Sequence, residues 1–224
     1  MKLFKEYAKR FSIEAFGLFI YAFGSLLGVK AGMVGTNAWN TLSLGMSDVM
    51  GISFGMANFI VSLIIIIIAI LGKGDLGFGS IINIVLYPIF ADWLLAIFSF
   101  VPVAENMAFG LFLTLLCQVI ISFATIIYMS PALGCGPRDT LMIILGRKVP
   151  KVPIGAVRFC VEAAAMGVGV LLGAPFGIGT VLVMVLQASI FQLACRICRY
   201  EPRVVKHENF ALTIKRVRDA VHAN

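Results

Sequence analysis

Long apolar runs separated by short polar breaks dominate the chain. Phe54–Leu71 is apolar except for Asn58 and Ser62, and its length approaches the ~20 residues that a helix needs to cross a membrane. Because lipid offers the backbone no hydrogen-bond partners, such runs are predicted to be helices. Six spans are predicted: Phe11–Val29, Phe54–Leu71, Phe78–Phe100, Ala108–Tyr128, Ile154–Leu172 and Ile178–Ile197. The pattern therefore predicts an all-α integral membrane protein.

Two shorter segments, Ala38–Met50 and Asp139–Val149, leave the number of crossings open. Each is too short to cross a ~30 Å hydrocarbon core as an ordinary helix. If both re-enter, six spans result and 16 of the 18 Lys and Arg residues lie in the cytoplasm; if both cross, eight spans result and 14 do. The preference for positive charge inside slightly favours six spans. Both models place the two termini in the cytoplasm.

The chain also contains a weak internal repeat. Trp39-Asn40-Thr41-Leu42 aligns with Arg138-Asp139-Thr140-Leu141 at an offset of 99 residues. At an offset of 100, three glycines of the first half align with glycines of the second: Gly55 with Gly155, Gly77 with Gly177, and Gly79 with Gly179. Duplicated halves are typical of transporters, whose solute site lies between them. The halves, about 11–100 and 108–198, are inverted with six spans, which we favour, and parallel with eight.

Composition agrees with this class. Charged residues make up 13% of the chain and mean hydropathy is +1.00, whereas a soluble domain carries about a quarter charged residues. The net charge of +7 reflects cytoplasmic basic residues and does not indicate nucleic-acid binding. One membrane domain is predicted over residues 1–202, followed by a basic tail over 203–224.

The tail has the pattern of an amphipathic helix. Phe210, Ile214, Val217 and Val221 recur at helical spacing, with basic residues beside this stripe. Such a helix binds anionic lipid at a membrane surface. The alternative, a solvated helix that packs on its own protein, fits the pattern equally well.

Glycines mark several predicted helix starts. In Leu133-Gly134-Cys135-Gly136-Pro137-Arg138-Asp139, a flexible break precedes a proline suited to a first helical turn. Gly179-Thr180 opens the last span in a similar way. Exposed amides at such helix starts attract anions, and starts at matching positions of two halves point to a transport site. The alternative is that these glycines only permit tight turns and close packing.

Arg158 and Glu162 carry charge inside an otherwise apolar span. Separated by four residues, they share a helix face, and charges in a membrane usually pair or face a cavity. They form either a structural ion pair, with Asp139, or a solute site in which Arg158 binds an anionic group. Trp39 and Asn40 opposite Arg138 and Asp139 would suit a zwitterion or an aromatic anion. The candidate solute-binding set is Arg158, Glu162, Arg138, Asp139, Trp39, Asn40, Asn58, Gly136, Gly179 and Thr180.

No catalytic constellation is evident. Both histidines, His207 and His222, lie in the tail, and no Ser–His–acid set, metal-ligand cluster or phosphate-binding loop is present. Cys195-x-x-Cys198 lacks the second pair that a typical metal site would need. We therefore expect a protein that is not an enzyme and holds no cofactor or metal.

The motif G-x-G-P-R-D-T-L, followed by a basic loop, V-R-x-x-x-E and L-L-G-x-x-x-G-I-G-T, resembles the YczE-like bacterial membrane proteins, related to the YitT group. W-N-T-L-S-L-G-M-S in the first half resembles the same family, with Asn40 standing where the family pattern implies an acid. The resemblance covers roughly residues 13–198. Family members are often encoded beside regulators that depend on pyridoxal phosphate, which implies vitamin B6 or an amino compound as solute.

These patterns predict a transporter for a small anionic or zwitterionic metabolite, with its site between the halves. A membrane scaffold, regulator or subunit of a larger complex is the alternative. A channel is disfavoured because no carboxylate or carbonyl ring is evident. Abundant small residues are compatible with either a compact monomer or a homodimer.

Overall fold

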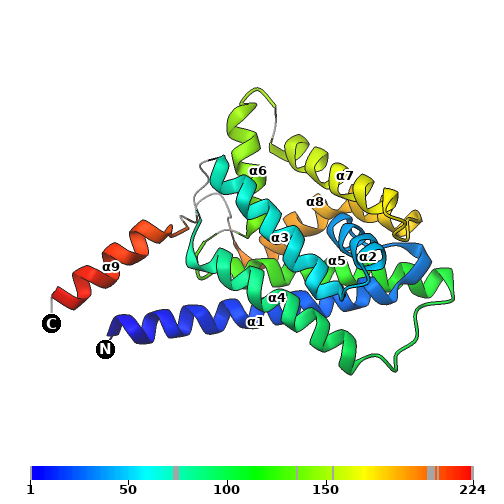
Figure 1. The fold of residues 1–224 in the computed structure, drawn as a ribbon, viewed down its shortest axis with the longest axis horizontal. Helices are drawn as coiled ribbons and strands as arrows, with labels where there is room; N and C mark the ends of the chain where they lie inside the picture. The colour runs from blue at the N-terminus through cyan, green and yellow to red at the C-terminus, as the bar shows by residue number, and fades with distance from the viewer. Residues whose placement is uncertain are drawn as a thin grey trace.

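The computed structural model describes residues 2–72, 76–134, 136–152, 154–200, 205 and 207–222, and every regular element within them is helical. Figure 1 shows a helical bundle, from which the C-terminal helix and the N-terminal end of the first helix project on the same side. The elements are α1 (Lys2–Lys30), the 3-10 helix η1 (Gly32–Val34), α2 (Ala38–Met50), α3 (Phe54–Leu71), α4 (Phe78–Ile97), α5 (Met107–Met129), α6 (Pro137–Lys148), α7 (Ile154–Leu171), α8 (Ile178–Cys198) and α9 (Phe210–His222). The predicted all-α fold is confirmed.

The two short helices lie where the sequence predicts them. α2 has the predicted bounds, and α6 begins two residues before the predicted segment. The side chain of Asn37 caps α2 by accepting a hydrogen bond from the amide of Asn40 at 3.0 Å. α6 begins after Gly136 with Pro137 in its first turn. At a rise of about 1.5 Å per residue, each helix is only about 20 Å long.

Glycines allow α1 to pack closely against α5. Gly17 faces the backbone of Tyr128, Gly24 faces Ile121, and Gly28 faces Cys117. Because residue numbers rise along α1 as they fall along α5, the two helices are antiparallel. Small residues at such contacts let helix backbones approach, which is the usual basis of packing between membrane helices.

We expect Gly24→Ala to lower the free energy of unfolding by about 1–2 kcal/mol, the usual cost of overpacking. A Cβ at this position would lie 2.9 Å from Cγ1 of Ile121 and 3.1 Å from Cγ2 of Ile120, so both side chains must shift. Gly167→Ala on α7 is the control, because no heavy atom lies within 4 Å of its added Cβ. Thermal unfolding in detergent should separate the two variants, and equal midpoints would contradict this packing.

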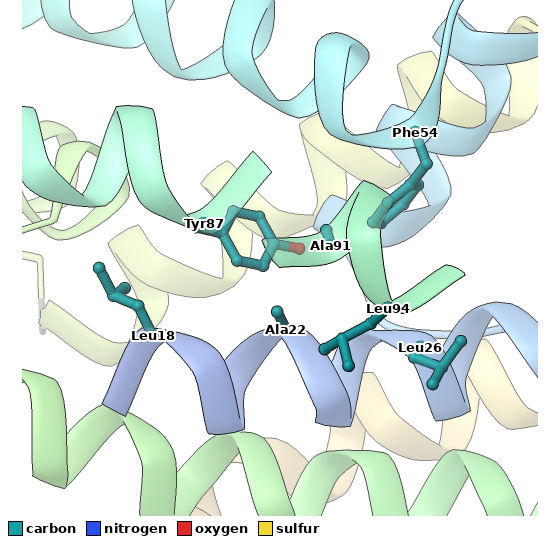
Figure 2. Close-up of a cluster of buried hydrophobic side chains, with 7 residues drawn as sticks. All are labelled: Leu18, Ala22, Leu26, Phe54, Tyr87, Ala91 and Leu94. Carbon is teal, nitrogen blue, oxygen red and sulfur yellow. The ribbon is translucent and has the colours of Figure 1, made fainter. Parts of the chain in front are cut away.

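A hydrophobic cluster joins α1 to α4. Leu18, Ala22 and Leu26 project from α1 towards α4, as Figure 2 shows. They meet Tyr87, Ala91 and Leu94 of α4, and Phe54 at the start of α3 extends the cluster. The seven side chains are nearly fully buried. This cluster holds the first-half helices together beside the α1–α5 contact.

The short helices pack against long helices distant in sequence. α2 lies against α7, and α6 lies against α3. Gly169 of α7 directly faces the backbone of Leu42 in α2, and Ile144 of α6 contacts Gly72 at the end of α3. In the same way α1 packs on α4, and α5 packs on α8. Segments from residues 1–100 and 107–198 are therefore interleaved.

Within the described residues, four helices are long and apolar enough to cross a membrane: α1, α3, α4 and α5. The two parts of α8, Ile178–Gln187 and Ser189–Cys198, are bent relative to each other and would make a fifth if they form one span. α7, which carries Arg158 and Glu162, is not among them. The structure thus gives four to five candidate spans where the sequence predicts six.

The C-terminal segment attaches beside the start of α4. The amide of Glu208 donates to the carbonyl of Ala132 at 2.8 Å, and the amide of Phe210 donates to the carbonyl of Leu76 at 3.1 Å. The rings of Phe78 and Phe210 meet edge to face, with centroids 4.8 Å apart. From there α9 leads away from the bundle, on the same side as the N-terminus (Figure 1).

Of the apolar stripe predicted for the tail helix, Phe210 packs against Phe78, whereas Ile214 and Val217 are exposed. Ile214 is 59% exposed and Val217 is 45% exposed, whereas the polar residue Thr213 is buried. The side chain of Val221 lies outside the described part of the chain. The first turn of α9 therefore attaches it to the bundle, and Ile214 and Val217 face outward.

Candidate functional site

An internal cavity of about 430 Å³ lies among helices from both predicted halves. Its aromatic lining is Tyr21, Trp39, Tyr87, Tyr128 and Phe191; its neutral polar lining includes Asn37, Asn83, Gln118 and Gln187; and its charged lining is Arg138, Arg158 and Glu162. Such a mixture of aromatic surface and a few convergent polar groups is typical of small-molecule sites.

Arg138 is positioned by the first turn of α6 and contacts three residues of the first half. Its guanidinium donates to Oδ1 of Asn58 at 2.6 Å and to the hydroxyl of Tyr21 at 3.3 Å. It also lies over the ring of Trp39, 4.7 Å from the centroid. Among the described side chains, these three partners of Arg138 are all neutral. An arginine in this situation is suited to binding an anion.

Arg158 and Glu162 form the second charged group of the cavity. Nε of Arg158 lies 3.0 Å from Oε1 of Glu162, as their spacing on one helix face predicts. The same oxygen accepts a hydrogen bond from the amide of Gln187 at 2.6 Å, which fixes the carboxylate between α7 and α8. The guanidinium of Arg158 also lies 5.7 Å from the ring centroid of Phe191. Gln187 and Phe191 therefore orient the Arg158–Glu162 ion pair at the cavity wall.

The predicted site residues are not all at the cavity. Arg138, Arg158, Glu162, Trp39 and Gly136 line it. Asn58 is fully buried, does not itself line the cavity, and accepts a hydrogen bond from the lining residue Arg138. The side chain of Asp139 lies outside the described part of the chain.

Asn40, Gly179 and Thr180 are placed elsewhere. Asn40 is fully buried, and its amide nitrogen lies 3.3 Å from Oγ1 of Thr36 in the turn before α2. Gly179 and Thr180 open α8 and abut Val34 and Gly35 in this region. Here the glycines provide close packing, because a Cβ on Gly179 would lie 2.8 Å from the carbonyl oxygen of Val34. These three residues do not line the cavity.

Several cavity residues were not predicted from the sequence. Tyr21, Tyr87 and Tyr128 form a cluster of edge-to-face rings, with Tyr21 centroids 5.2 Å and 6.0 Å from the other two. His207, assigned by sequence only to the tail, also lines the cavity. The sequence signal that could have identified these tyrosines is a tyrosine within an apolar run. A buried tyrosine usually turns its hydroxyl towards a polar partner.

A metal site is not indicated in the part of the chain that the structure describes. No group of three or more His, Cys, Asp and Glu side chains there is arranged to hold an ion. The cavity offers instead two guanidinium groups, one carboxylate, amides and aromatic faces. This chemistry favours recognition of an organic ion by hydrogen bonds and ring contacts.

The fold and cavity define a polytopic α-helical membrane protein with a charged internal site. The chain belongs to the YczE-like membrane proteins, and its residues 8–196 match the Family of unknown function (DUF6198). An uncharacterized protein of Haemophilus influenzae is 29% identical over 197 residues, covering 88% of each chain. The uncharacterized membrane protein YczE of Bacillus subtilis is 26% identical over 192 residues, covering 85% of this chain and 87% of its own. No solved structure matches the chain.

Proposed function

We propose that the protein transports a small anionic or zwitterionic metabolite across the bacterial inner membrane. The observation that carries this proposal is Arg138, which faces the cavity with Asn58, Tyr21 and Trp39 as its neutral partners among the described residues. A charge that lines the cavity of a membrane protein is costly unless it is compensated, so an anionic solute group would relieve the cost when it binds. A catalytic role is not part of this proposal.

The rest of the cavity narrows the solute class. Glu162 offers a carboxylate that an ammonium group could approach, while the Trp39 and Tyr128 rings offer flat apolar surface. A zwitterion or aromatic anion would meet both kinds of contact within about 430 Å³. A vitamin B6-like compound or an amino compound, as the family resemblance implies, has this chemistry and is included in the proposal.

We place the solute between two inverted repeats, each with three spans and one re-entrant helix. The crossed packing supports this arrangement: the contact of α2 with α7 is mirrored by that of α6 with α3, and α1–α4 by α5–α8. Trp39 aligns with Arg138 and Asn58 aligns with Arg158 in the repeat. Trp39, Arg138 and Arg158 line the cavity, and Asn58 contacts Arg138. The antiparallel α1–α5 contact is also what inversion requires.

The two termini belong in the cytoplasm in this proposal. Contacts between Arg10 and Glu208 bring the N-terminal turns and the C-terminal segment together. Lys and Arg residues are concentrated in these two terminal segments, as the positive-inside preference expects. The outward apolar residues of α9, flanked by Lys215 and Arg216, would then lie on the anionic cytoplasmic leaflet.

Thermal stability of the purified protein in detergent should rise with one or more solutes from a panel of carboxylates, zwitterions and B6 vitamers. A solute that binds only the folded state stabilises it by mass action. We expect Arg158→Ala to weaken this response while the protein remains folded, because Arg158 lines the same cavity as Arg138. Loss of folding in Arg158→Ala would identify the Arg158–Glu162 pair as structural instead.

Deletion of residues 211–224, which keeps the cavity-lining residues Val205 and His207, separates the transporter from the main alternative. A scaffold or regulatory subunit that works through its basic tail would lose function on deletion, whereas solute uptake into vesicles would persist. The transport proposal would be overturned if no solute stabilised the protein and if deletion of the tail abolished the protein's function in the cell. These two results together would favour a membrane partner.

A further inference from the structure

Glu14 of α1 is a buried carboxyl group outside the solute cavity. Its exposed fraction is 2%, and it lies within a candidate membrane span. Its Oε2 atom has no hydrogen-bond partner in the described part of the chain. An ionised carboxylate held this way would bear a large desolvation cost with little compensation.

The carboxyl group lies in a recess at the start of α4. Gly79 provides the space, since a Cβ there would lie 2.7 Å from Oε1 and 3.1 Å from Oε2 of Glu14. The amide of Gly79 donates to the carbonyl of Leu133 at 3.0 Å, so that amide does not serve the carboxylate. The recess therefore has room for the carboxyl group of Glu14. The Gly79 amide, however, does not donate a hydrogen bond that would stabilise a charge on it.

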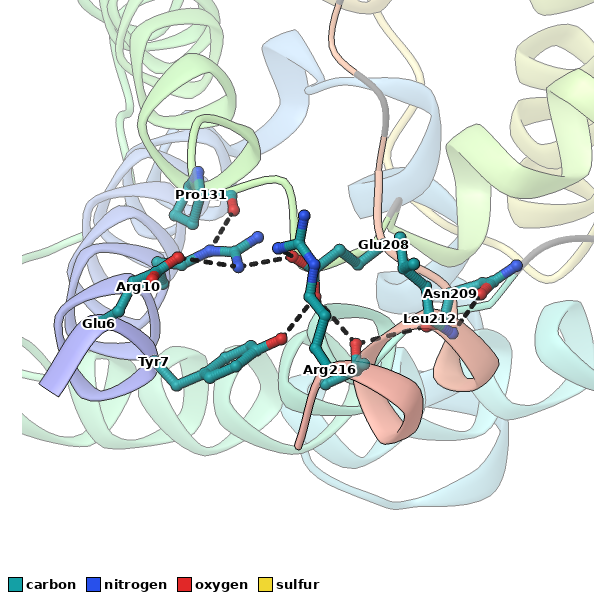
Figure 3. Close-up of polar contacts among 9 residues, drawn as sticks. Glu6, Tyr7, Arg10, Pro131, Glu208, Asn209, Leu212 and Arg216 are labelled. Carbon is teal, nitrogen blue, oxygen red and sulfur yellow. Dashed lines mark hydrogen bonds and ion pairs between the residues drawn. The ribbon is translucent and has the colours of Figure 1, made fainter. Parts of the chain in front are cut away.

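Among the described residues, Arg10 is the charged group that interacts electrostatically with Glu14. It lies one turn earlier on α1. Arg10 is already engaged: it donates to the carbonyl of Pro131 at 2.8 Å and to Oε1 of Glu208 at 2.6 Å. Figure 3 shows Tyr7, Arg10 and Arg216 converging on Glu208, which lies opposite α1. Tyr128 of α5 lies opposite Gly17, about one turn after Glu14 on α1.

We propose that Glu14 is a proton-binding site whose occupancy controls attachment of the C-terminal segment. In the protonated state, the carboxyl O–H bond is intact and Arg10 remains with Glu208. When that bond breaks, the proton passes to water and the Glu14 carboxylate competes with Glu208 for Arg10. Because Val205 and His207 line the cavity just before Glu208, release of this contact would reach the cavity wall. This proposal goes beyond solute transport and needs no bound solute.

Infrared spectra of the full-length protein in detergent test the proton directly. At about pH 7, wild type should show the C=O stretch of a protonated carboxyl, because Glu14 is 2% exposed and its Oε2 has no partner among the described residues. This band should be missing from Glu14→Gln and retained in Glu105→Gln, which removes an exposed carboxylate. Its absence from wild type at neutral pH, or its persistence in Glu14→Gln, overturns the proposal.

Hydrogen exchange of the 210–222 peptide tests the coupling. Raising the pH until the Glu14 band disappears should speed exchange about tenfold in wild type, after correction for the intrinsic rate, and leave Glu14→Gln unchanged. Equal behaviour of the two proteins would show that Glu14 does not act on the segment. If Glu14→Gln does not fold, Glu14→Leu provides a second neutral side chain of similar size, with the same expected results.

Discussion

Arg138→Gln should weaken solute binding by about 10–100-fold and leave the protein folded. Hydrogen bonds to a charged group contribute about 1.5–3 kcal/mol, which corresponds to this range. Gln retains a donor for Oδ1 of Asn58, which lies 2.6 Å from the guanidinium, so local packing should survive. The measurement is the solute concentration that gives half-maximal thermal stabilisation, compared between the variant and wild type.

Arg199→Gln is the matched control, because Arg199 is an exposed arginine beyond the end of α8. It removes the same charge from the protein without changing the cavity, and should leave binding within about twofold. Arg138→Lys should recover part of the affinity, since it restores charge without the planar donor geometry. Equal binding by Arg138→Gln and wild type would show that the solute does not contact this arginine.

Local sequence signals predicted the short helices well. A cap at Asn37 and a glycine–proline start at Gly136 act through neighbouring backbone groups, so sequence spacing alone determines where α2 and α6 begin. The predicted spans that begin at Phe78 and Ile178 begin at the same residues in α4 and α8.

The composition of the cavity was harder to predict, because it depends on how each helix is rotated in the bundle. Arg158 and Glu162 were found from charge within an apolar run, and both line the cavity. Asn40 has equally polar chemistry but turns towards Thr36, away from the cavity. Only tertiary packing separates these cases, since neighbours in sequence can face different sides of one helix.

Glu14 is a candidate functional residue that the sequence prediction missed. It is an acidic residue within the run Phe11–Val29, where a charge is as unexpected as at Arg158. Its position near the basic N-terminus resembles an ordinary interfacial charge. The structure shows instead a buried side chain at Gly79, a contact between segments 65 residues apart that no local pattern encodes.

Glu208→Ala should release the C-terminal segment and cost about 3 kcal/mol in local stability, the range for removing one partner of a buried ion pair. Glu208 is 4% exposed and accepts hydrogen bonds from Arg10, Tyr7, Thr213 and Arg216. Alanine leaves both guanidinium groups without this carboxylate. Amide exchange over residues 210–222 should therefore accelerate about 100-fold relative to wild type. Asp219→Ala is the control on the same helix, because its pair with Arg218 is exposed and should matter little.

The same contact should weaken in acid. Burial alone would raise the pKa of Glu208, but hydrogen bonds from Arg10, Tyr7 and Thr213 outweigh burial and hold the pKa below its ordinary value. A lowered pKa in the attached state means that attachment is fully stabilised above the ordinary value of 4.5 and loses stability as pH falls through the lowered pKa. Exchange in wild type should thus accelerate in acid towards the rate of Glu208→Ala, which should show no such acid step. Since loss of a proton from Glu14 is proposed to act at higher pH, attachment should be strongest between the two transitions. An acid step that persists in Glu208→Ala would assign the titration to another carboxyl group.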